Sequence, residues 1–216
     1  MKRDLSPARN RWGMTLIETL MVLSILVVLM ALVVPAFNSL TKGRSLNRGG
    51  TLVANLAHLA RQNSMSKNAM TALLLVTDPA APSRNRQLAL MELVPPANGA
   101  KAQSSDWKQI GPWEKLPEGV VVDLCDTDEA PTSKPFPAFP QIRSDGRVLQ
   151  KWKYLIFLPG GNIARDQSVQ FRLVEGIFTG AGDLPVYTHG GSDGQPSNYY
   201  TITIIAATGR TKIDRP

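Results

Sequence analysis

The apolar residues of this chain are concentrated near its amino end. Between residues 14 and 37, 19 of 24 residues are apolar, and the run 20–34 is interrupted only by Ser24. As a helix rising about 1.5 Å per residue, this stretch would be about 36 Å long. That length covers the ~30 Å hydrocarbon core of a bilayer. The pattern therefore predicts a transmembrane helix over 14–37.

An amphipathic helical pattern continues over 38–68. Its apolar side chains recur at helical spacing and are carried by Leu52, Val53, Leu56, Ala57, Leu59 and Ala60. Gly43, Gly49 and Gly50 each weaken a helix by up to ~1 kcal/mol relative to Ala. We therefore expect a flexible joint in the first half of this segment. His58 lies beside the apolar stripe and is expected to be a packing or surface residue.

From residue 69 onward the pattern changes to short apolar runs, several with period-two alternation, which is typical of β-strands. The expected strands are 71–77, 87–94, 119–125, 153–158, 169–174 and 199–207. A turn is expected at 159–162, and loops at 95–96, 131–140 and 180–195. These elements predict an α+β fold, with a long amino-terminal helix docked on an antiparallel β-sheet domain over 69–216. The insertion-like region 95–150 is where we expect specificity, because loops over a sheet vary freely.

Composition and charge refine this outline. The chain has 216 residues, 43% of them hydrophobic and 19% charged, and a formal net charge of +7. These values fit one domain plus an extension and do not fit a disordered protein. A single cysteine excludes a disulfide framework and a multi-cysteine zinc site, and two histidines leave little for a histidine-rich metal centre. We therefore expect no cofactor and no metal.

The leader, residues 1–13, carries four basic residues and one acidic residue. Positive charge ahead of an apolar span predicts that the amino end stays cytoplasmic and that the rest crosses outward. Without the leader, 20 basic residues stand against 16 acidic ones, so the net charge falls to +4. The leader therefore carries three of the seven net positive charges, and their expected role is to orient the chain in the membrane.

Two other interpretations of the amino end fit less well. A secretory signal peptide would have a shorter apolar region and a small-residue cleavage site, and the sequence Val-Pro-Ala at 34–36 is a poor one. A plain membrane anchor gives no reason for Glu18, because a carboxylate inside a span costs around 2.5–3.5 kcal/mol on insertion scales. Glu18 therefore indicates a partner.

The string GMTLIE at 13–18 resembles the prepilin signature of type IV pilins and type II secretion pseudopilins. The resemblance implies that an inner-membrane prepilin peptidase cleaves after Gly13 and methylates the new amino terminus at Met14. Glu18 and Pro35 then occupy the fifth and twenty-second positions of the mature chain, as they do in the family. Met14 departs from the family's more common Phe.

The resemblance implies an assembly role for Glu18 and Pro35. The cationic amine of Met14 and the carboxylate of Glu18 on a neighbouring subunit are each costly alone in lipid and tolerable as a pair. Pro35 removes a helical hydrogen bond and can kink or locally melt the helix. Alternatively, Pro35 only marks where the helix meets the membrane surface.

Shorter strings narrow the resemblance. Residues 52–68 resemble the helix end of general secretion pathway protein H and FimT-like minor subunits, and 202–212 resembles their closing strand and Gly-Arg motif. Segments 52–68 and 116–122 together also resemble the Verru_Chthon cassette protein D family. The resemblance implies a pilin-like, non-enzymatic minor pseudopilin with a single span in the bacterial inner membrane and a periplasmic β domain. Its implied partners are the prepilin peptidase, other pilins or pseudopilins and the inner-membrane assembly platform.

The sequence offers little catalytic chemistry, since it contains no GxSxG, P-loop, HExxH or CxxC motif. Asp123, Asp126, Asp128 and Glu129 cluster within seven residues. Their spacing lacks the glycine of an EF-hand loop, which favours a solvated acidic loop over a calcium site. Cys125 ends an apolar strand and is expected to be a buried thiol.

Basic residues also gather at the carboxyl end, where Arg210, Lys212 and Arg215 fall within six residues. FimT-like subunits are associated with DNA capture through a Gly-Arg-x-Arg motif near this end. Lys212 stands where that motif has Arg, and lysine keeps the phosphate attraction but loses the bidentate fork. The neighbouring Tyr199 and Tyr200 could stack on bases. The sequence favours a solvated basic tail, and the alternatives are a DNA-binding minor pilin or an anchor that joins no filament.

Overall fold

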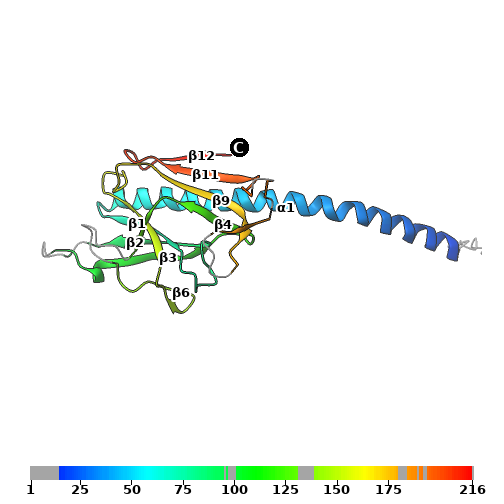
Figure 1. Ribbon diagram of the computed structural model, residues 1–216, viewed down its shortest axis with the longest axis horizontal. Helices are drawn as coiled ribbons and strands as arrows, with labels where there is room; N and C mark the ends of the chain where they lie inside the picture. Colours follow the sequence, from blue (N-terminus) through cyan, green and yellow to red (C-terminus); the bar gives the residue numbers. More distant parts are fainter. Residues whose placement is uncertain are drawn as a thin grey trace, which may run out of the picture. The chain divides into compact units, whose positions relative to one another are not determined.

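The computed structural model describes residues 15–94, 96, 101–130, 139–179, 184–188, 190–191 and 194–215, without the side chains of 32–43, 124 and 128–130. The chain divides into two compact units, Met1–Thr41 and Lys42–Pro216. One helix, α1 (Leu16–Ser66), contributes to both units (Figure 1). All the described strands belong to the second unit.

Two antiparallel sheets make up most of the second unit. The first has the order β3-β2-β1-β8-β5, and its strands are β1 (Thr71–Val76), β2 (Gln87–Leu93), β3 (Trp107–Lys115), β5 (Asp128–Ala130) and β8 (Trp152–Phe157). The strands of the second are β4 (Val120–Cys125), β9 (Val169–Ile177), β10 (Val186–Tyr187), β11 (Tyr199–Ile204) and β12 (Thr211–Asp214). In it, β9 pairs with β4, β10 and β11, and β11 pairs with β12. A small hairpin of β6 (Arg143–Ser144) and β7 (Arg147–Val148) and a 3-10 turn, η1 (Ser104–Asp106), complete the described elements.

The main hydrophobic core lies between the second part of α1 and both sheets. Its α1 members are Leu46, Val53, Leu56, Ala57 and Ala60, and they pack with residues of β1, β2, β4, β8, β9 and β11. This spacing is the one-sided stripe expected of a helix with a single buried face. The stripe includes Leu56 as predicted, but Leu59 is wrongly assigned to it, since that residue is 48% exposed.

A flexible joint was predicted around Gly43, Gly49 and Gly50, and at Gly49 and Gly50 the structure contradicts it. The helix is unbroken there, and both glycines are buried. A Cβ on Gly49 would lie 3.0 Å from Cγ1 of Val120, and a Cβ on Gly50 would overlap the ring of Tyr200. These glycines therefore let the helix backbone approach the second sheet closely, which is a packing role.

Sheet one is covered on both faces. Every residue of β1 and β2 is buried, and a second apolar cluster on the outer face joins them to Trp107, Ile142, Leu149, Trp152 and Tyr154. Phe139 stacks on Trp107 at 4.6 Å between ring centroids. The hydroxyl of Ser144 donates to Oε1 of Gln87 at 2.5 Å and fastens the β6–β7 hairpin. Several described residues of 95–150 therefore belong to an outer structural layer, and the specificity expected of this region stays a prediction.

The predicted α+β arrangement, a long amino-terminal helix on antiparallel sheets, is confirmed. The six predicted strands correspond to β1, β2, β4, β8, β9 and β11, and the turn at 159–162 is closed by a hydrogen bond from Leu158 N to Asn162 O of 2.8 Å. The sequence pattern did not predict the short strands β5, β6, β7 and β10, the last of which lies in the expected loop 180–195, nor the longer strands β3 and β12. Both are edge strands with polar residues, and β3 contains Pro112, which an edge tolerates.

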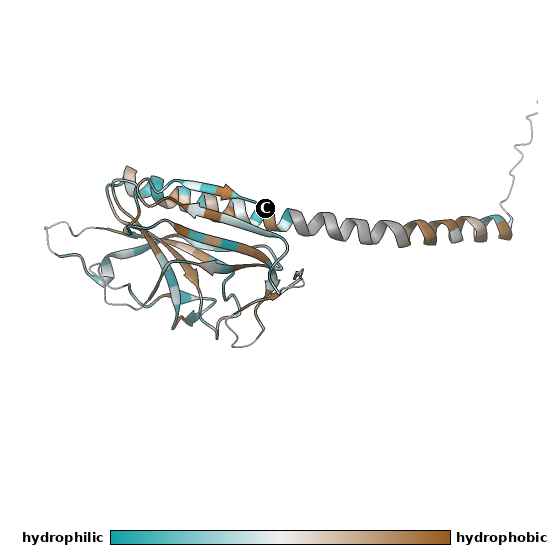
Figure 2. Ribbon diagram, turned by 45° about the horizontal axis from the view of Figure 1, so that its top comes forward, coloured by the Kyte–Doolittle hydropathy of each residue, from teal (hydrophilic) through white to brown (hydrophobic). Residues whose placement is uncertain are grey.

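Within the part of the chain that the structure describes, no helix is both long and apolar enough to cross a membrane. The predicted span, 14–37, includes Met14 and the side chains of 32–37, which lie outside the described residues. From residue 15 to residue 31, every side chain is exposed, and Figure 2 shows how apolar this part of α1 is. The helix assignment continues through Pro35, so its backbone does not melt there.

Candidate functional site

Of the predicted processing and assembly residues, Glu18 and Pro35 lie in α1. Gly13 and Met14 are outside the described residues. Glu18 lies in the first turn of α1, where its Oε2 accepts hydrogen bonds from Thr15 N at 2.8 Å and Thr15 Oγ1 at 2.9 Å. Thr15 Oγ1 in turn accepts a longer bond of 3.4 Å from Glu18 N. These reciprocal bonds form a capping box, which stabilises the start of a helix.

The capping box gives Glu18 an intramolecular role that our sequence analysis did not consider. The signal was present, because Thr15-Leu16-Ile17-Glu18 matches the pattern S/T-x-x-E before an apolar run. A cap and an intersubunit charge pair are compatible, since a carboxylate has two oxygens and about four acceptor positions. The cap orients the carboxylate at the amino end of the helix, where the positive end of the helix dipole also favours it.

The other end of α1 is fastened by a charged network. Nζ of Lys67 donates to Oε2 of Glu92 at 2.6 Å, and Nδ2 of Asn63 donates to the same oxygen at 3.2 Å and to Oγ1 of Thr71 at 3.0 Å. The side chain of Glu92 is 11% exposed, whereas that of Lys67 is 53% exposed. Burial raises the pKa of Glu92, but the bonds from Lys67 and Asn63 outweigh it, so the pKa lies below its ordinary value.

This network makes stability depend on pH in a predictable direction. Because the pKa of Glu92 is lower in the folded state, its stabilisation is present above the unfolded-state pKa and is lost as the pH falls through the folded-state pKa. We expect Glu92→Gln to lower the free energy of unfolding by about 1–2 kcal/mol at pH 7. Below the folded-state pKa the difference from wild type should become small. Urea titrations across this pH range measure the difference in the free energy of unfolding between Glu92→Gln and wild type. The control Glu118→Gln, at an exposed position, should change this free energy little at high or low pH.

The Gly-Arg motif near the carboxyl end has a packing role. Gly209 has a φ of +62° in the turn between β11 and β12, and its N–H donates to Ile205 O at 2.7 Å. A Cβ there would overlap the carbonyl oxygen of Gly161, in the turn between β8 and β9. Nε of Arg61 donates to Thr208 O at 2.7 Å and ties both turns to α1. We call Arg61, Gly161, Thr208 and Gly209 the turn lock.

The three basic residues of the carboxyl end do not converge on one position. Arg210 is exposed beside the turn lock, and its backbone oxygen accepts from Ile205 N at 2.9 Å. Nζ of Lys212 lies 3.0 Å from a carboxylate oxygen of Asp214. Nη1 of Arg215 donates to Oδ1 of Asn47 on α1 at 3.0 Å. This last bond joins the carboxyl-terminal residues to α1.

The two tyrosines proposed as stacking platforms are engaged in packing. Tyr200 is partly buried against the main core beside Gly50. The guanidinium of Arg172 lies 5.9 Å from the ring centroid of Tyr199. Both tyrosines are partly buried, so we assign them a packing role on the strand.

The predicted solvated acidic loop is wrong for its first member. The side chain of Asp123 is 1% exposed and pairs with the guanidinium of Arg172, and Tyr187 OH donates to its other oxygen at 3.1 Å. Asp126 is exposed, while the side chains of 128–129 lie outside the described residues. Among the side chains that are described, no group of three His, Cys, Asp or Glu could hold a metal ion.

Cys125 is buried as predicted, and its Sγ lies 3.1 Å from Oγ1 of Thr127. Burial raises the pKa of this thiol to about 11, which keeps it protonated and unreactive at neutral pH. The predicted surface or packing position of His58 is an exposed one on α1.

Comparison with known proteins gives only distant matches. The sequence matches no protein-family model and no curated protein. Among solved structures, the minor pseudopilin EpsH from the type 2 secretion system of Vibrio cholerae is 11% identical with a TM-score of 0.42, covering 80% of this chain and 98% of its own. The type IV minor pilin FimU of Pseudomonas aeruginosa is 13% identical with a TM-score of 0.43, covering 82% of this chain and 96% of its own. Similarity this distant assigns neither a family nor a function.

Proposed function

We propose that this chain is a minor, non-enzymatic subunit of a type II secretion or type IV pilus-like filament, assembled through α1. The observation that carries the proposal is that the two parts of this one helix have different surroundings. Of its side chains from 15 to 31, 13 of 17 are apolar and all are exposed, whereas its second part supplies a face of the main core. A helix that is apolar all round needs an apolar environment. Lipid supplies it before assembly, and other subunits' helices supply it afterwards.

In this proposal the chain is inserted in the bacterial inner membrane, with its amino end cytoplasmic and its β domain periplasmic. The prepilin peptidase removes residues 1–13 and methylates Met14, and the assembly platform then adds the subunit to other pilins or pseudopilins. The signature at 13–18 and the basic leader support this order of events. The shorter likenesses to general secretion pathway protein H, FimT and the Verru_Chthon cassette protein D family favour a minor subunit.

Processing tests the first step. Gly13→Ala, co-expressed with a prepilin peptidase, should leave a precursor heavier than the mature chain by roughly 1.4 kDa, the share of 13 residues in a 23.5 kDa chain of 216. Gly13 is the last residue of the leader and the one that the peptidase recognises. Replacing Gly13 removes this recognition and leaves the sequence of the following helix unchanged. Intact-mass spectrometry of the membrane fraction gives the result. Mature protein of unchanged mass in this variant would exclude cleavage after Gly13.

Assembly tests the role of Glu18. Glu18→Ala should be processed normally but should co-assemble with other pilins several-fold less, because the amine of Met14 on a neighbour loses its counter-ion. Thr15→Ala is the matched control, since it removes both hydrogen bonds of the Thr15 hydroxyl in the cap and keeps the carboxylate. The yield of crosslinks between subunits in membranes measures co-assembly for both variants. An equal loss in both variants would mean that Glu18 acts only as a helix cap.

A DNA-binding minor pilin remains the alternative. Its predicted contact residues are Arg210, Lys212 and Arg215, and the pairing of Lys212 with Asp214 and of Arg215 with Asn47 gives it no specific support. A salt-sensitive gel shift that Arg210→Ala abolishes would favour it over a scaffolding role.

A further inference from the structure

An exposed apolar cluster lies at one end of the second unit. Ile177 on β9 and Val186 on β10 are opposite each other in an antiparallel pair and are 53% and 55% exposed. Leu184, two residues before Val186, is 73% exposed. We call Ile177, Leu184 and Val186 the apolar tip. Three large apolar side chains so exposed and so close together mark a surface that contacts something other than water.

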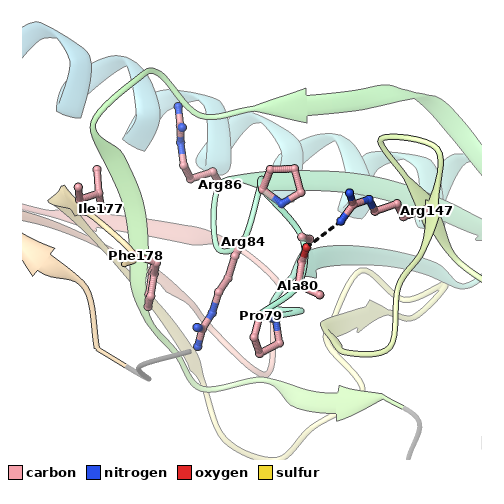
Figure 3. A pocket seen from close by; sticks show the side chains of 9 residues that line it. Pro79, Ala80, Arg84, Arg86, Arg147, Ile177 and Phe178 are labelled. Atoms are coloured by element: carbon pink, nitrogen blue, oxygen red, sulfur yellow. Dashed lines mark hydrogen bonds between the residues drawn. The ribbon is translucent and has the colours of Figure 1, made fainter. Parts of the chain in front are cut away.

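A cavity of about 430 Å³ adjoins this tip, lined by Ile177, Phe178, Arg84, Arg86 and Arg147 with the loop 79–82. The guanidinium of Arg84 lies 4.7 Å from the ring centroid of Phe178. Figure 3 shows Arg84 and Arg86 pointing in opposite directions, and Nη2 of Arg86 reaches the carbonyl oxygen of Pro117 at 3.4 Å. The guanidinium groups do not converge, so the cavity is not built to grip one small anion.

Other arginines at this end keep their positive charge uncompensated by their described hydrogen bonds. Nη1 of Arg147 donates to Ala80 O at 3.2 Å, and Arg215 donates to the amide oxygen of Asn47. Both acceptors are neutral. Arg44 and Arg48 are exposed on α1. We call Arg44, Arg48, Arg147 and Arg215 the arginine base.

Described carboxylates offset part of this charge, among them Glu175, which lines a cavity beside the apolar tip. Glu114 and Glu118 line a neighbouring cavity together with Arg48, and Asp145 is 3.1 Å from Nζ of Lys115. Asp183 and Asp193 lie outside the described residues. The described surface therefore keeps a basic excess beside an apolar cluster.

Within the second unit, the apolar tip and the arginine base lie near the first residues that α1 contributes to it. Ser45 on α1 lines a cavity of about 130 Å³ with Glu175 and Thr188, which are each two residues from the apolar tip. Lys42, at the start of the unit, is five residues beyond Phe37, the end of the predicted span. Five residues of helix rise only about 8 Å. If residues 14–37 cross the membrane, this end of the unit cannot be far from its surface.

We propose that the apolar tip and the arginine base dock the β domain on an anionic lipid surface before the subunit enters the filament. The inference rests on the proposed function, since the tether brings this surface to the bilayer. Arginines are attracted to anionic headgroups, and apolar side chains enter the boundary between headgroups and acyl chains. DNA would satisfy the arginines but would leave the apolar tip in water, so a lipid surface fits both halves of the patch.

The test uses the full chain reconstituted in vesicles of phosphatidylcholine, with or without phosphatidylglycerol, whose acyl chains carry a bromine quencher. A fluorophore is attached at Val186→Cys, and the buried Cys125 with its raised pKa stays unlabelled. Gln170→Cys, at an exposed position on β9, the strand that pairs with β10, is the matched control. We expect quenching at Val186→Cys only with phosphatidylglycerol, and none at Gln170→Cys.

Charge removal gives the size of the effect. Arg147→Gln and Arg215→Gln should each lower the ratio of docked to undocked chains about fivefold, and the double variant about 25-fold. Equal quenching with and without phosphatidylglycerol, or no quenching, would overturn the proposal. Quenching that appears only at a high protein-to-lipid ratio would assign the surface to a second copy of the chain. Alkaline extraction of the same vesicles tests the membrane anchor separately from the docking. A chain that is extracted contradicts the proposed function. A chain that stays in the vesicles but is not quenched contradicts only the docking.

Discussion

Gly209→Ala is expected to lower the free energy of unfolding by about 2–4 kcal/mol. Two costs add. The φ of +62° disfavours any residue with a Cβ, and the new Cβ would overlap the carbonyl oxygen of Gly161 and lie 3.2 Å from Cδ of Arg61. A backbone oxygen cannot rotate away as a side chain can. The two turns would therefore separate, and the bond from Arg61 to Thr208 would weaken with them.

Gly146→Ala separates the two costs. Gly146 has a φ of +77°, in the turn between β6 and β7, and a Cβ there meets nothing within 4 Å. It should lose only the conformational part, about 1 kcal/mol. Urea denaturation of both variants makes the comparison. Equal losses would show that the turn lock contributes nothing beyond backbone conformation.

Gly50→Ala is expected to destabilise the chain even though alanine is the better helix former. Propensity alone favours alanine by about 1 kcal/mol. Its Cβ, however, would overlap the ring of Tyr200, and overpacking of a core costs typically 1–3 kcal/mol. Since Tyr200 is partly buried against that core, its ring has little room to withdraw. An overlap with both Cδ1 and Cε1 of Tyr200 places the overpacking cost in the upper part of that range. We therefore expect a net loss of about 1–2 kcal/mol.

The control and the rescue use neighbouring residues. Thr51→Ala, at the next and exposed position of α1, should be neutral or slightly stabilising. Combining Gly50→Ala with Tyr200→Leu should recover stability relative to the sum of the single changes, as a double-mutant cycle would measure. A stabilising Gly50→Ala would mean that the helix and the second sheet are loosely packed there.

The turn lock also changes the interpretation of the carboxyl end. The Gly-Arg motif was singled out as a DNA-binding feature by resemblance, but Gly209 is needed for the close approach of two turns. Arg210 contributes its backbone oxygen to the same turn. A motif can thus persist for packing reasons, and binding has to be tested at the side chain of Arg210 alone.

The outer layer of the first sheet was not predicted. Within 95–150 the sequence predicted the strand at 119–125 and loops at 95–96 and 131–140, but it did not indicate that Trp107, Ile142 and Leu149 pack on the outer face of the first sheet. The clue was in β1 and β2, whose sequences TALLLV and QLALMEL are too continuously apolar for a sheet with one wet face. A sheet that is buried on both faces needs a second covering layer, and residues of 95–150 form part of it.

The sequence by itself determined the elements that depend on local pattern. The apolar run ahead of an amphipathic segment, the six strands with their alternation, and the signature around Gly13 and Glu18 are all properties of neighbouring residues. Only the tertiary structure decided the partners of residues far apart in the chain. Gly50 meets Tyr200, Gly209 meets Gly161, and Asp123 is neutralised by Arg172 instead of solvent. The reason is that a glycine or a carboxylate carries no local sign of what will approach it, since that approach is set by how the sheets and the helix pack together.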